Sequence, residues 1–285
     1  MRVGNMTNTG KAAWMMILTT TNKYIHGVIT VAQSLRRLGS QYPLVVLYTP
    51  AVSEAALRLL SSYGCHLKPI QPIHPPGTTN YQFPRFAETW TKMIVWDQVE
   101  YERVVLIDAD MLPMQNMDEL MDIPLPDSDH IGACHACTCN PQKTSTYPPE
   151  WNPTNCAYNN PHGAKVNYFN SGLIVLRPSH VKFQAIMDKI YGTNNLTSYT
   201  FPDQDFLNEV FNEKWVKLPY IYNALKTLPV THPEMWRLEH VKNIHFILTR
   251  KPWDGEGEDD RYLHNVWWEH VNKEDLIAVD DIINS

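Results

Sequence analysis

The stretch Arg103-Val104-Val105-Leu106-Ile107-Asp108-Ala109-Asp110 places two carboxylates directly after a continuous apolar run. Such a run is typical of a strand that is buried on both faces of a parallel sheet. Ligands of these sheets bind beyond the carboxyl ends of the strands, and strand alternation would send Asp108 and Asp110 to the same side. Carboxylate oxygens bind Mg²⁺ or Mn²⁺, which neutralise diphosphates. The alternative is a solvated strand end, since Asp is common in turns.

Further apolar runs and amphipathic segments alternate around this strand. The runs predict strands over residues 12–19, 42–48, 66–70 and 168–176, and a short last strand over 246–248. Helical spacing predicts helices over 24–38, 53–63, 89–96 and 203–213, the second with Ser53 as its N-cap and Gly64 at its end. This alternation predicts an α/β fold with a Rossmann-like, mainly parallel central sheet flanked by helices.

The chain is expected to form a single domain over residues 13–285, preceded by a flexible N-terminus over residues 1–12. Residues 122–165 are rich in Pro, Asn, Cys and Thr and lack sustained periodicity. We therefore predict an irregular, Cys-containing insertion over about 126–166 rather than a further layer of the fold. Loops of this length in compact domains are usually functional or disordered.

Four of the five cysteines fall close together, namely Cys134, Cys137, Cys139 and Cys156. They could hold zinc, with His135 or Cys156 completing a tetrahedral set. The alternative is a group of reduced cysteines in an irregular insertion, which is favoured because the spacing matches no standard zinc template.

The chain has 285 residues and a net charge of −6, without the clustered basic surface of nucleic-acid-binding proteins. Neither a signal-peptide h-region nor a membrane-spanning apolar run is present, so a cytoplasmic location is expected. The phosphate-binding motif G-x-x-x-x-G-K-[ST] is also absent, which argues against phosphoryl or nucleotidyl transfer, the rival chemistry for a metal-bound Asp pair.

Several motifs occur in one order along the chain, and together they are more specific than any one of them. They are Leu18-Thr19-Thr20, Asp108-Ala109-Asp110, Asn170-Ser171-Gly172, Asp203-Gln204, and His245-Phe246 with Lys251-Pro252-Trp253. This set resembles glycosyltransferase family 8, which contains glycogenin and the galactinol synthases, over roughly residues 14–255. The resemblance implies a GT-A fold and Mn²⁺-dependent transfer of a hexose from a UDP-sugar to a hydroxyl acceptor, with retention of anomeric configuration. Mg²⁺ is the alternative metal.

The resemblance also implies the roles of individual residues. Asp108, Asp110 and His245 would ligate the metal. The donor would be bound by uridine-pocket residues, by groups near the phosphates and by residues that hold the sugar: Leu18, Thr20, Tyr24, Arg85, Ala109, Asn170, Ser171 and Lys251. The catalytic residues would be Asp203 and Gln204 beside the anomeric carbon, together with Lys92 near the phosphate or donor sugar.

The sequence also departs from glycogenin. The segment after Tyr222-Asn223 contains no tyrosine before His232, which argues against self-glucosylation, and Leu248 stands where the family has a glycine. UDP-glucose and UDP-galactose are the favoured donors. Galactinol synthase-like transfer to a polyol, use of UDP-N-acetylglucosamine, and a catalytically silent binding module are the alternatives. The assembly state is left open between a monomer and a homodimer.

Overall fold

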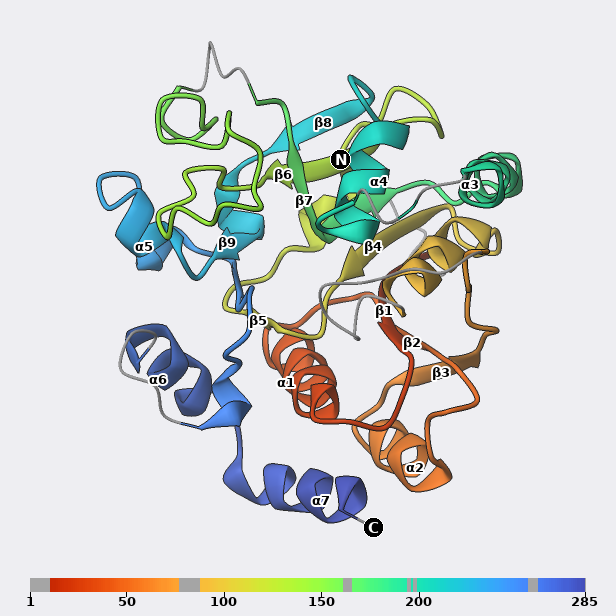
Figure 1. The fold of residues 1–285 in the computed structure, drawn as a ribbon. Helices are drawn as coiled ribbons and strands as arrows, with labels where there is room; N and C mark the ends of the chain where they lie inside the picture. The colour runs from red at the N-terminus through yellow and green to blue at the C-terminus, as the bar shows by residue number, and fades with distance from the viewer. Residues whose placement is uncertain are drawn as a thin grey trace, which may run out of the picture.

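The computed structural model describes residues 11–76, 88–160, 166–193, 196, 199–255 and 261–284. Within these ranges, a seven-stranded sheet of order β3-β2-β1-β4-β7-β6-β8 forms the centre of the molecule (Figure 1). Its strands are β1 (Ala12–Leu18), β2 (Leu44–Tyr48), β3 (His66–Pro69), β4 (Arg103–Ile107), β6 (Ile131–His135), β7 (Phe169–Leu176) and β8 (Trp215–Leu218).

The sheet is mostly parallel, as predicted. Strands β3, β2, β1 and β4 are parallel neighbours, and β6 is parallel to β8. Strand β7 runs antiparallel to both β4 and β6. Because of this reversal, the first residues of β7 lie where β4 ends, and the N–H of Asp108 donates a 2.8 Å hydrogen bond to the carbonyl of Gly172.

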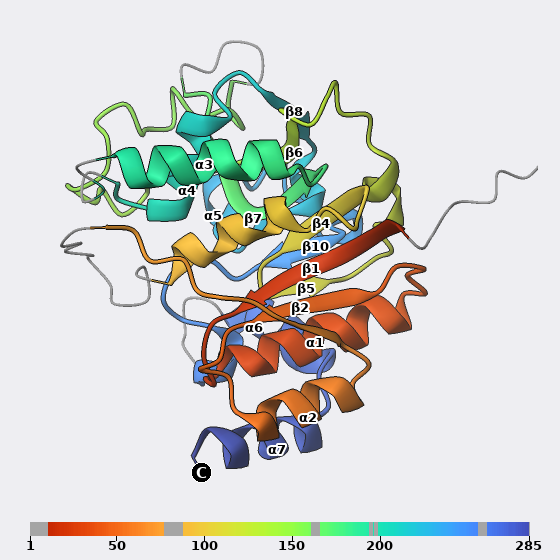
Figure 2. The ribbon, with the colours of Figure 1, turned by 90° about the vertical axis from the view of Figure 1, so that its right-hand side faces the viewer.

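Helices cover both faces of the sheet. Helices α1 (Tyr24–Arg37) and α2 (Glu54–Ser62) pack on one face, and α7 (Lys273–Ile283) lies against them (Figure 2). The other face is covered by the 3₁₀ helix η3 (Thr89–Asp97), α3 (His180–Gly192) and α4 (Pro202–Val210). Helix α2 begins as predicted, because the Ser53 side chain accepts a hydrogen bond from the N–H of Ala56.

A second, smaller sheet has the order β5-β10-β9 and is formed by β5 (Met111–Pro113), β10 (Asn243–His245) and β9 (Ala224–Leu225). Strand β10 is antiparallel to β5, with His245 opposite Met111. Strand β9 is followed by the short helix α5 (Leu228–Thr231), and helix α6 (Arg261–Glu269) adds Trp267 to the apolar cluster beneath this sheet. The small sheet thus carries His245 to the turn that follows β4.

Two sequence predictions of strands were wrong. The segment predicted to be wholly irregular contains β6, a central strand held between β7 and β8. Its apolar run is short, and its strand structure depends on partners distant in sequence. The last strand spans Asn243–His245 rather than residues 246–248, because its register is set by pairing with β5. No helix among the described residues is both long and apolar enough to cross a membrane.

Candidate active site

A cleft of about 400 Å³ lies at the sheet edge where β1 and β4 end and β7 begins. Its volume is within the range of small-molecule sites. Most of the residues predicted to form the site border it, namely Leu18, Tyr24, Lys92, Asp108, Ala109, Asp110, Asn170, Ser171, Asp203, Gln204, His245 and Lys251.

Asp108 and Asp110 lie in the turn between β4 and β5 and not within a strand, so strand alternation does not explain their position. One carboxylate oxygen of each and a ring nitrogen of His245 nevertheless all lie within 4.8 Å of one another. Gly27 of α1 packs tightly on this turn: a Cβ at this glycine would lie 1.9 Å from the carbonyl oxygen of Ala109. The close approach of α1 holds the turn against the end of β4.

The imidazole of His245 is fixed on both sides. Its Nε2 lies 3.2 Å from an oxygen of Asp110, and its Nδ1 lies 2.8 Å from Oδ1 of Asn223. The amide oxygen of Asn223 accepts a hydrogen bond from Nδ1, so Nε2 is the ring nitrogen that faces Asp110 and that would coordinate a metal in place of its proton. His245 is 4% exposed, so these contacts are made in a site largely shielded from water.

Two lysines bring positive charge to the carboxylates. Lys92 Nζ lies 3.0 Å from Asp108 and 2.9 Å from Asp203, and Lys251 Nζ lies 2.5 Å from Asp110. Burial opposes the charged form of Lys92, but the two carboxylates outweigh it and raise the pKa of Lys92 above its usual value. Burial likewise raises the pKa of Asp110, but Lys251 and His245 outweigh it and lower that pKa. Burial also raises the pKa of Asp108, and the nearby Lys92 only partly opposes that effect.

A chain of hydrogen bonds joins the start of β7 to α4. The side-chain amide of Asn223 donates to Asn170 (2.8 Å), Asn170 donates to Gln204 (2.8 Å), and Gln204 donates to the hydroxyl of Tyr168 (3.0 Å). In parallel, the hydroxyl of Ser171 donates to Asp203 over 2.9 Å. The Asn-Ser-Gly and Asp-Gln motifs, 33 residues apart at Ser171 and Gln204, thus form one rigid polar surface.

Tyr24 also borders the cleft and makes an edge-on contact with Trp253, with ring centroids 5.5 Å apart. Leu18 lies at the end of β1 and borders the cleft, as does its neighbour Thr19. Thr20 is not among the residues that border it. Arg85 lies outside the described residues.

The structure adds site residues that had no predicted role. Asn223 positions His245, and Gly172 leaves room for the imidazole, since a Cβ there would lie 2.3 Å from the ring. The insertion supplies an aromatic wall, in which Tyr147 and Trp151 border the cleft with ring centroids 5.3 Å apart. The Asn-Ser-Gly motif itself was a signal for Gly172, whereas the roles of Asn223 and the insertion depend on tertiary contacts.

The sequence profile of glycosyl transferase family 8 matches residues 15–257. The chain belongs to this family. Among its relatives, galactinol synthase 1 of Ajuga reptans is 31% identical and aligns with 93% of this chain and 83% of its own length. The chain is accordingly a glycosyltransferase, and the family assignment made from the ordered motifs is confirmed.

Solved structures of glycosyltransferases share the fold, which confirms the predicted GT-A architecture. The galactosyltransferase LgtC, solved with donor and acceptor sugar analogs, superposes with a TM-score of 0.64 at 15% identity, over 92% of this chain and 98% of LgtC. The bifunctional glycosyltransferase WbbM superposes with a TM-score of 0.68 at 17% identity, over 97% of this chain. The chain spans 52% of WbbM, so it corresponds to one part of that longer protein.

Proposed function

We propose that the chain is a divalent-metal-dependent, retaining hexosyltransferase that uses a UDP-sugar. The observation that carries this proposal is the convergence of Asp108, Asp110 and His245 at a cleft that also contains Lys92 and Lys251. Acidic ligands beside cationic side chains suit a bound cation together with a diphosphate.

The residues present fit a divalent ion. Two carboxylates and an imidazole offer mixed oxygen and nitrogen ligands, and this set favours Mn²⁺ over Mg²⁺, which prefers oxygen alone. The Nδ1 contact of His245 with Asn223 is the kind of outer hydrogen bond that orients metal-binding histidines. When bound, the ion would supply positive charge to the diphosphate as it leaves the sugar.

The chain's own cations and polar groups would do the remaining work. Lys251 borders the cleft beside Asp110, where its ammonium would bind a diphosphate oxygen and stabilise departing UDP. Asn170 and Gln204 present amide groups to the cleft that would bind hydroxyls of the donor sugar. Both amides are already held by hydrogen bonds, so little ordering would be needed on binding.

Asp203 is the candidate for stabilising the reacting carbon. Lys92 and Ser171 hold one of its carboxylate oxygens at 2.9 Å each, and the residue is 8% exposed. Such a carboxylate could attack the anomeric carbon and form a covalent intermediate. It could equally stabilise positive charge on the sugar while a phosphate oxygen accepts the acceptor's proton on the same face. Both routes retain configuration, and both place Asp203 at the centre of the reaction.

For the acceptor, we propose galactosyl transfer from UDP-galactose to a polyol. Galactinol synthases of Arabidopsis thaliana and Ajuga reptans align with 93–96% of the chain at 29–31% identity in the leading alignments, and this supports the choice. The aromatic wall formed by Tyr147 and Trp151 suits a ring-shaped acceptor, since flat rings pack well on aromatic faces. The short segment after Asn223 carries no tyrosine, so self-glucosylation is not expected.

The test is release of UDP by the purified protein from UDP-galactose, UDP-glucose or UDP-N-acetylglucosamine. Each donor is supplied with Mn²⁺ or with EDTA, and with or without a cyclic polyol such as myo-inositol. We expect Mn²⁺-dependent release from UDP-galactose that rises when the polyol is added. Preference for either of the other donors would replace the proposed sugar.

The variant Asp110→Ala should abolish release, whereas Glu54→Gln, which changes an exposed carboxylate on α2, should leave it unchanged. UDP-sugar binding without turnover in the presence of each metal and acceptor would instead favour a catalytically silent nucleotide-sugar-binding module. Differential scanning fluorimetry with UDP separates that outcome from a chain that does not bind the nucleotide at all.

A further inference from the structure

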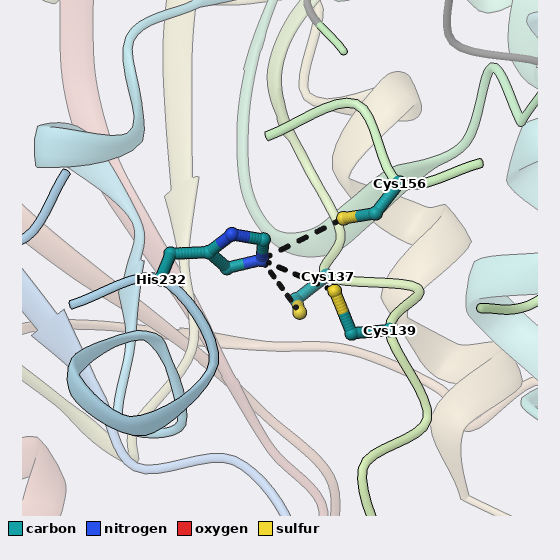
Figure 3. Close-up of side chains that lie close together, drawn as sticks. All are labelled: Cys137, Cys139, Cys156 and His232. Carbon is teal, nitrogen blue, oxygen red and sulfur yellow. Dashed lines mark hydrogen bonds between the residues drawn. The ribbon is translucent and has the colours of Figure 1, made fainter. Parts of the chain in front are cut away.

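A second group of metal-binding side chains lies apart from the carboxylates of the active site. The sulfurs of Cys137, Cys139 and Cys156 and a ring nitrogen of His232 all lie within 4.8 Å of one another. Figure 3 shows the three sulfurs converging on Nε2 of His232. Three of these residues come from the insertion, and the histidine directly follows α5.

We propose that Cys137, Cys139, Cys156 and His232 bind a structural zinc ion. Three cysteines and one histidine are a standard ligand set for structural zinc. This set differs from the zinc set that the sequence left open: it does not contain His135, and its histidine comes from outside the insertion. Cys134 is also excluded, because its sulfur points to the carbonyl of Pro219, 3.2 Å away.

The distances agree with a tetrahedral ion. With Zn–S bonds of about 2.3 Å and a Zn–N bond of about 2.0–2.1 Å, tetrahedral angles place each sulfur roughly 3.6 Å from the nitrogen. The observed distances from His232 Nε2 are 3.3 Å to Cys137, 3.4 Å to Cys139 and 3.7 Å to Cys156. The four groups are thus already arranged around one point.

Hydrogen bonds to Nε2 of His232 do not account for the approach of all three sulfurs to this nitrogen. A neutral imidazole nitrogen has one lone pair, so Nε2 can accept a hydrogen bond from only one of the three thiols that approach it. A zinc ion would use that lone pair and all three sulfurs together. On binding, the three thiols would release their protons to solvent and become thiolates, and the imidazole would stay neutral.

The surroundings of the ligands also suit a metal. Nδ1 of His232 lies 2.9 Å from Oδ1 of Asn159, which keeps the proton on Nδ1 and leaves Nε2 free to coordinate. The amide of the same asparagine lies 3.8 Å from the sulfur of Cys139, and backbone groups of Thr138 and Tyr158 hydrogen-bond to Cys156. Outer contacts of this kind orient metal ligands and stabilise thiolates.

The position of the site gives it a role in the fold of the cleft. It joins residues 137–156 of the insertion to the segment after α5, which lie side by side in Figure 1. Cys137 itself borders the cleft, as do Tyr147 and Trp151 between the ligands. A zinc ion would therefore fix the aromatic wall, whereas Leu18, Asn170 and Ser171 on the donor side are held by strands β1 and β7.

The test is the zinc content of the full-length protein, purified without added metal and measured by mass spectrometry. We expect about one zinc per chain. Cys156→Ser and His232→Ala should lose it, whereas Cys134→Ser, which changes a neighbouring buried cysteine outside the set, should retain it. Asp110→Ala should also retain it, which separates this site from the carboxylates of the active site.

Two further measurements keep the test decisive if a ligand variant does not fold. Co²⁺ added to reduced, metal-free wild-type protein should give the thiolate charge-transfer and d–d absorption bands of a tetrahedral site. His232→Cys should keep the metal and strengthen the charge-transfer band, because it adds a fourth thiolate. Zinc far below one per chain, with no uptake of Zn²⁺ or Co²⁺ by the reduced protein, would overturn the proposal. A disulfide among these cysteines, shown by thiol titration, would overturn it as well.

Discussion

Gly172 lies against His245 so closely that a Cβ at the glycine would be 2.3 Å from Cε1 of the imidazole and 2.9 Å from its Nδ1. Real side chains do not approach so closely, and Cε of Met111 would lie 2.8 Å away, so the position admits no side chain unless the histidine and the methionine both move. The glycine of the Asn-Ser-Gly motif therefore leaves the space that the imidazole of His245 occupies. This contact joins the main sheet, which carries Gly172 in β7, to the small sheet, which carries His245 in β10.

Replacing this glycine tests whether the space matters for metal use. Gly172→Ala should displace the imidazole and weaken metal-dependent activity by about 10–100-fold, the usual effect of disturbing a metal ligand's surroundings. The activity should be measured over a range of Mn²⁺ concentrations. Gly192→Ala is the control, because a Cβ there meets no atom of the described residues within 4 Å outside its own stretch of helix. If both variants show the wild-type Mn²⁺ dependence, the space at Gly172 is not required for metal-dependent activity.

Lys92 is expected to hold the site together as well as to take part in catalysis. Lys92→Met leaves the largely buried carboxylates of Asp108 and Asp203 without their shared cation, and breaking such a pair costs about 3–5 kcal/mol. Lys189→Met is the matched control, since its pair with Glu209 is solvent-exposed and is worth about 0–1 kcal/mol. Urea unfolding measures the free energy of unfolding of both variants.

Mn²⁺ should raise the melting temperature of Lys92→Met by more than that of the wild type, because the ion replaces the lost positive charge. Equal unfolding free energies for Lys92→Met and Lys189→Met would show that the buried ion pairs contribute little to stability. In that case, the role of Lys92 would be limited to catalysis.

Leu248 occupies a backbone conformation that favours glycine, with φ of 69°. A residue with a Cβ in this left-handed region is destabilised by about 1–2 kcal/mol. Glycine avoids that strain but loses about 0.5–1 kcal/mol through the entropy of the unfolded chain. Leu248→Gly should therefore stabilise the protein by up to about 1 kcal/mol, measured by urea unfolding.

The comparison with Leu248→Ala isolates the backbone effect, since alanine removes most of the side chain and keeps the Cβ. We expect Leu248→Ala to be no more stable than the wild type. Equal gains for the alanine and glycine variants would show that the leucine side chain, and not the backbone conformation, is unfavourable. Because Leu248 borders the cleft, both variants also report on donor access through the KM for the UDP-sugar.

Local patterns were enough to predict much of the fold. The strands β1, β2 and β4 are continuous apolar runs, and α2 has its cap residue and its terminal glycine in the sequence. What failed depended on distant partners. Strand β6 is recognisable only through β7 and β8, and β10 takes its register from β5.

The same division holds for the site. Asp108 and Asp110 are adjacent to an apolar strand and were found from that pattern, and the ordered motifs located the polar residues around them. Asn223 lies 22 residues before His245 along the chain, and His232 lies 95 residues after Cys137. No local spacing connects such pairs, so the orienting asparagine and the fourth ligand of the cysteine cluster emerged only in three dimensions.

Stability toward acid provides a test that does not involve the active-site chemistry. Burial lowers the pKa of His26 below its usual value, and the hydrogen bond from this side chain to Asp280 only partly opposes that effect. The unfolded chain therefore binds a proton at a higher pH than the folded protein does. The neutral form of His26 therefore contributes to the free energy of unfolding at pH values above about 6.5, the pKa of the histidine in the unfolded chain. This contribution is lost as the pH falls below that value.

His26→Gln keeps an amide donor for Asp280 and removes the titrating group. Between about pH 7.5 and about pH 5.5, the wild type should lose more unfolding free energy than this variant, by at most about 1.4 kcal/mol for each pH unit below the unfolded pKa. Urea unfolding at both pH values measures the difference. Equal losses for the two proteins would mean that His26 takes up its proton in the folded state as readily as in the unfolded chain, and that another group governs the acid sensitivity.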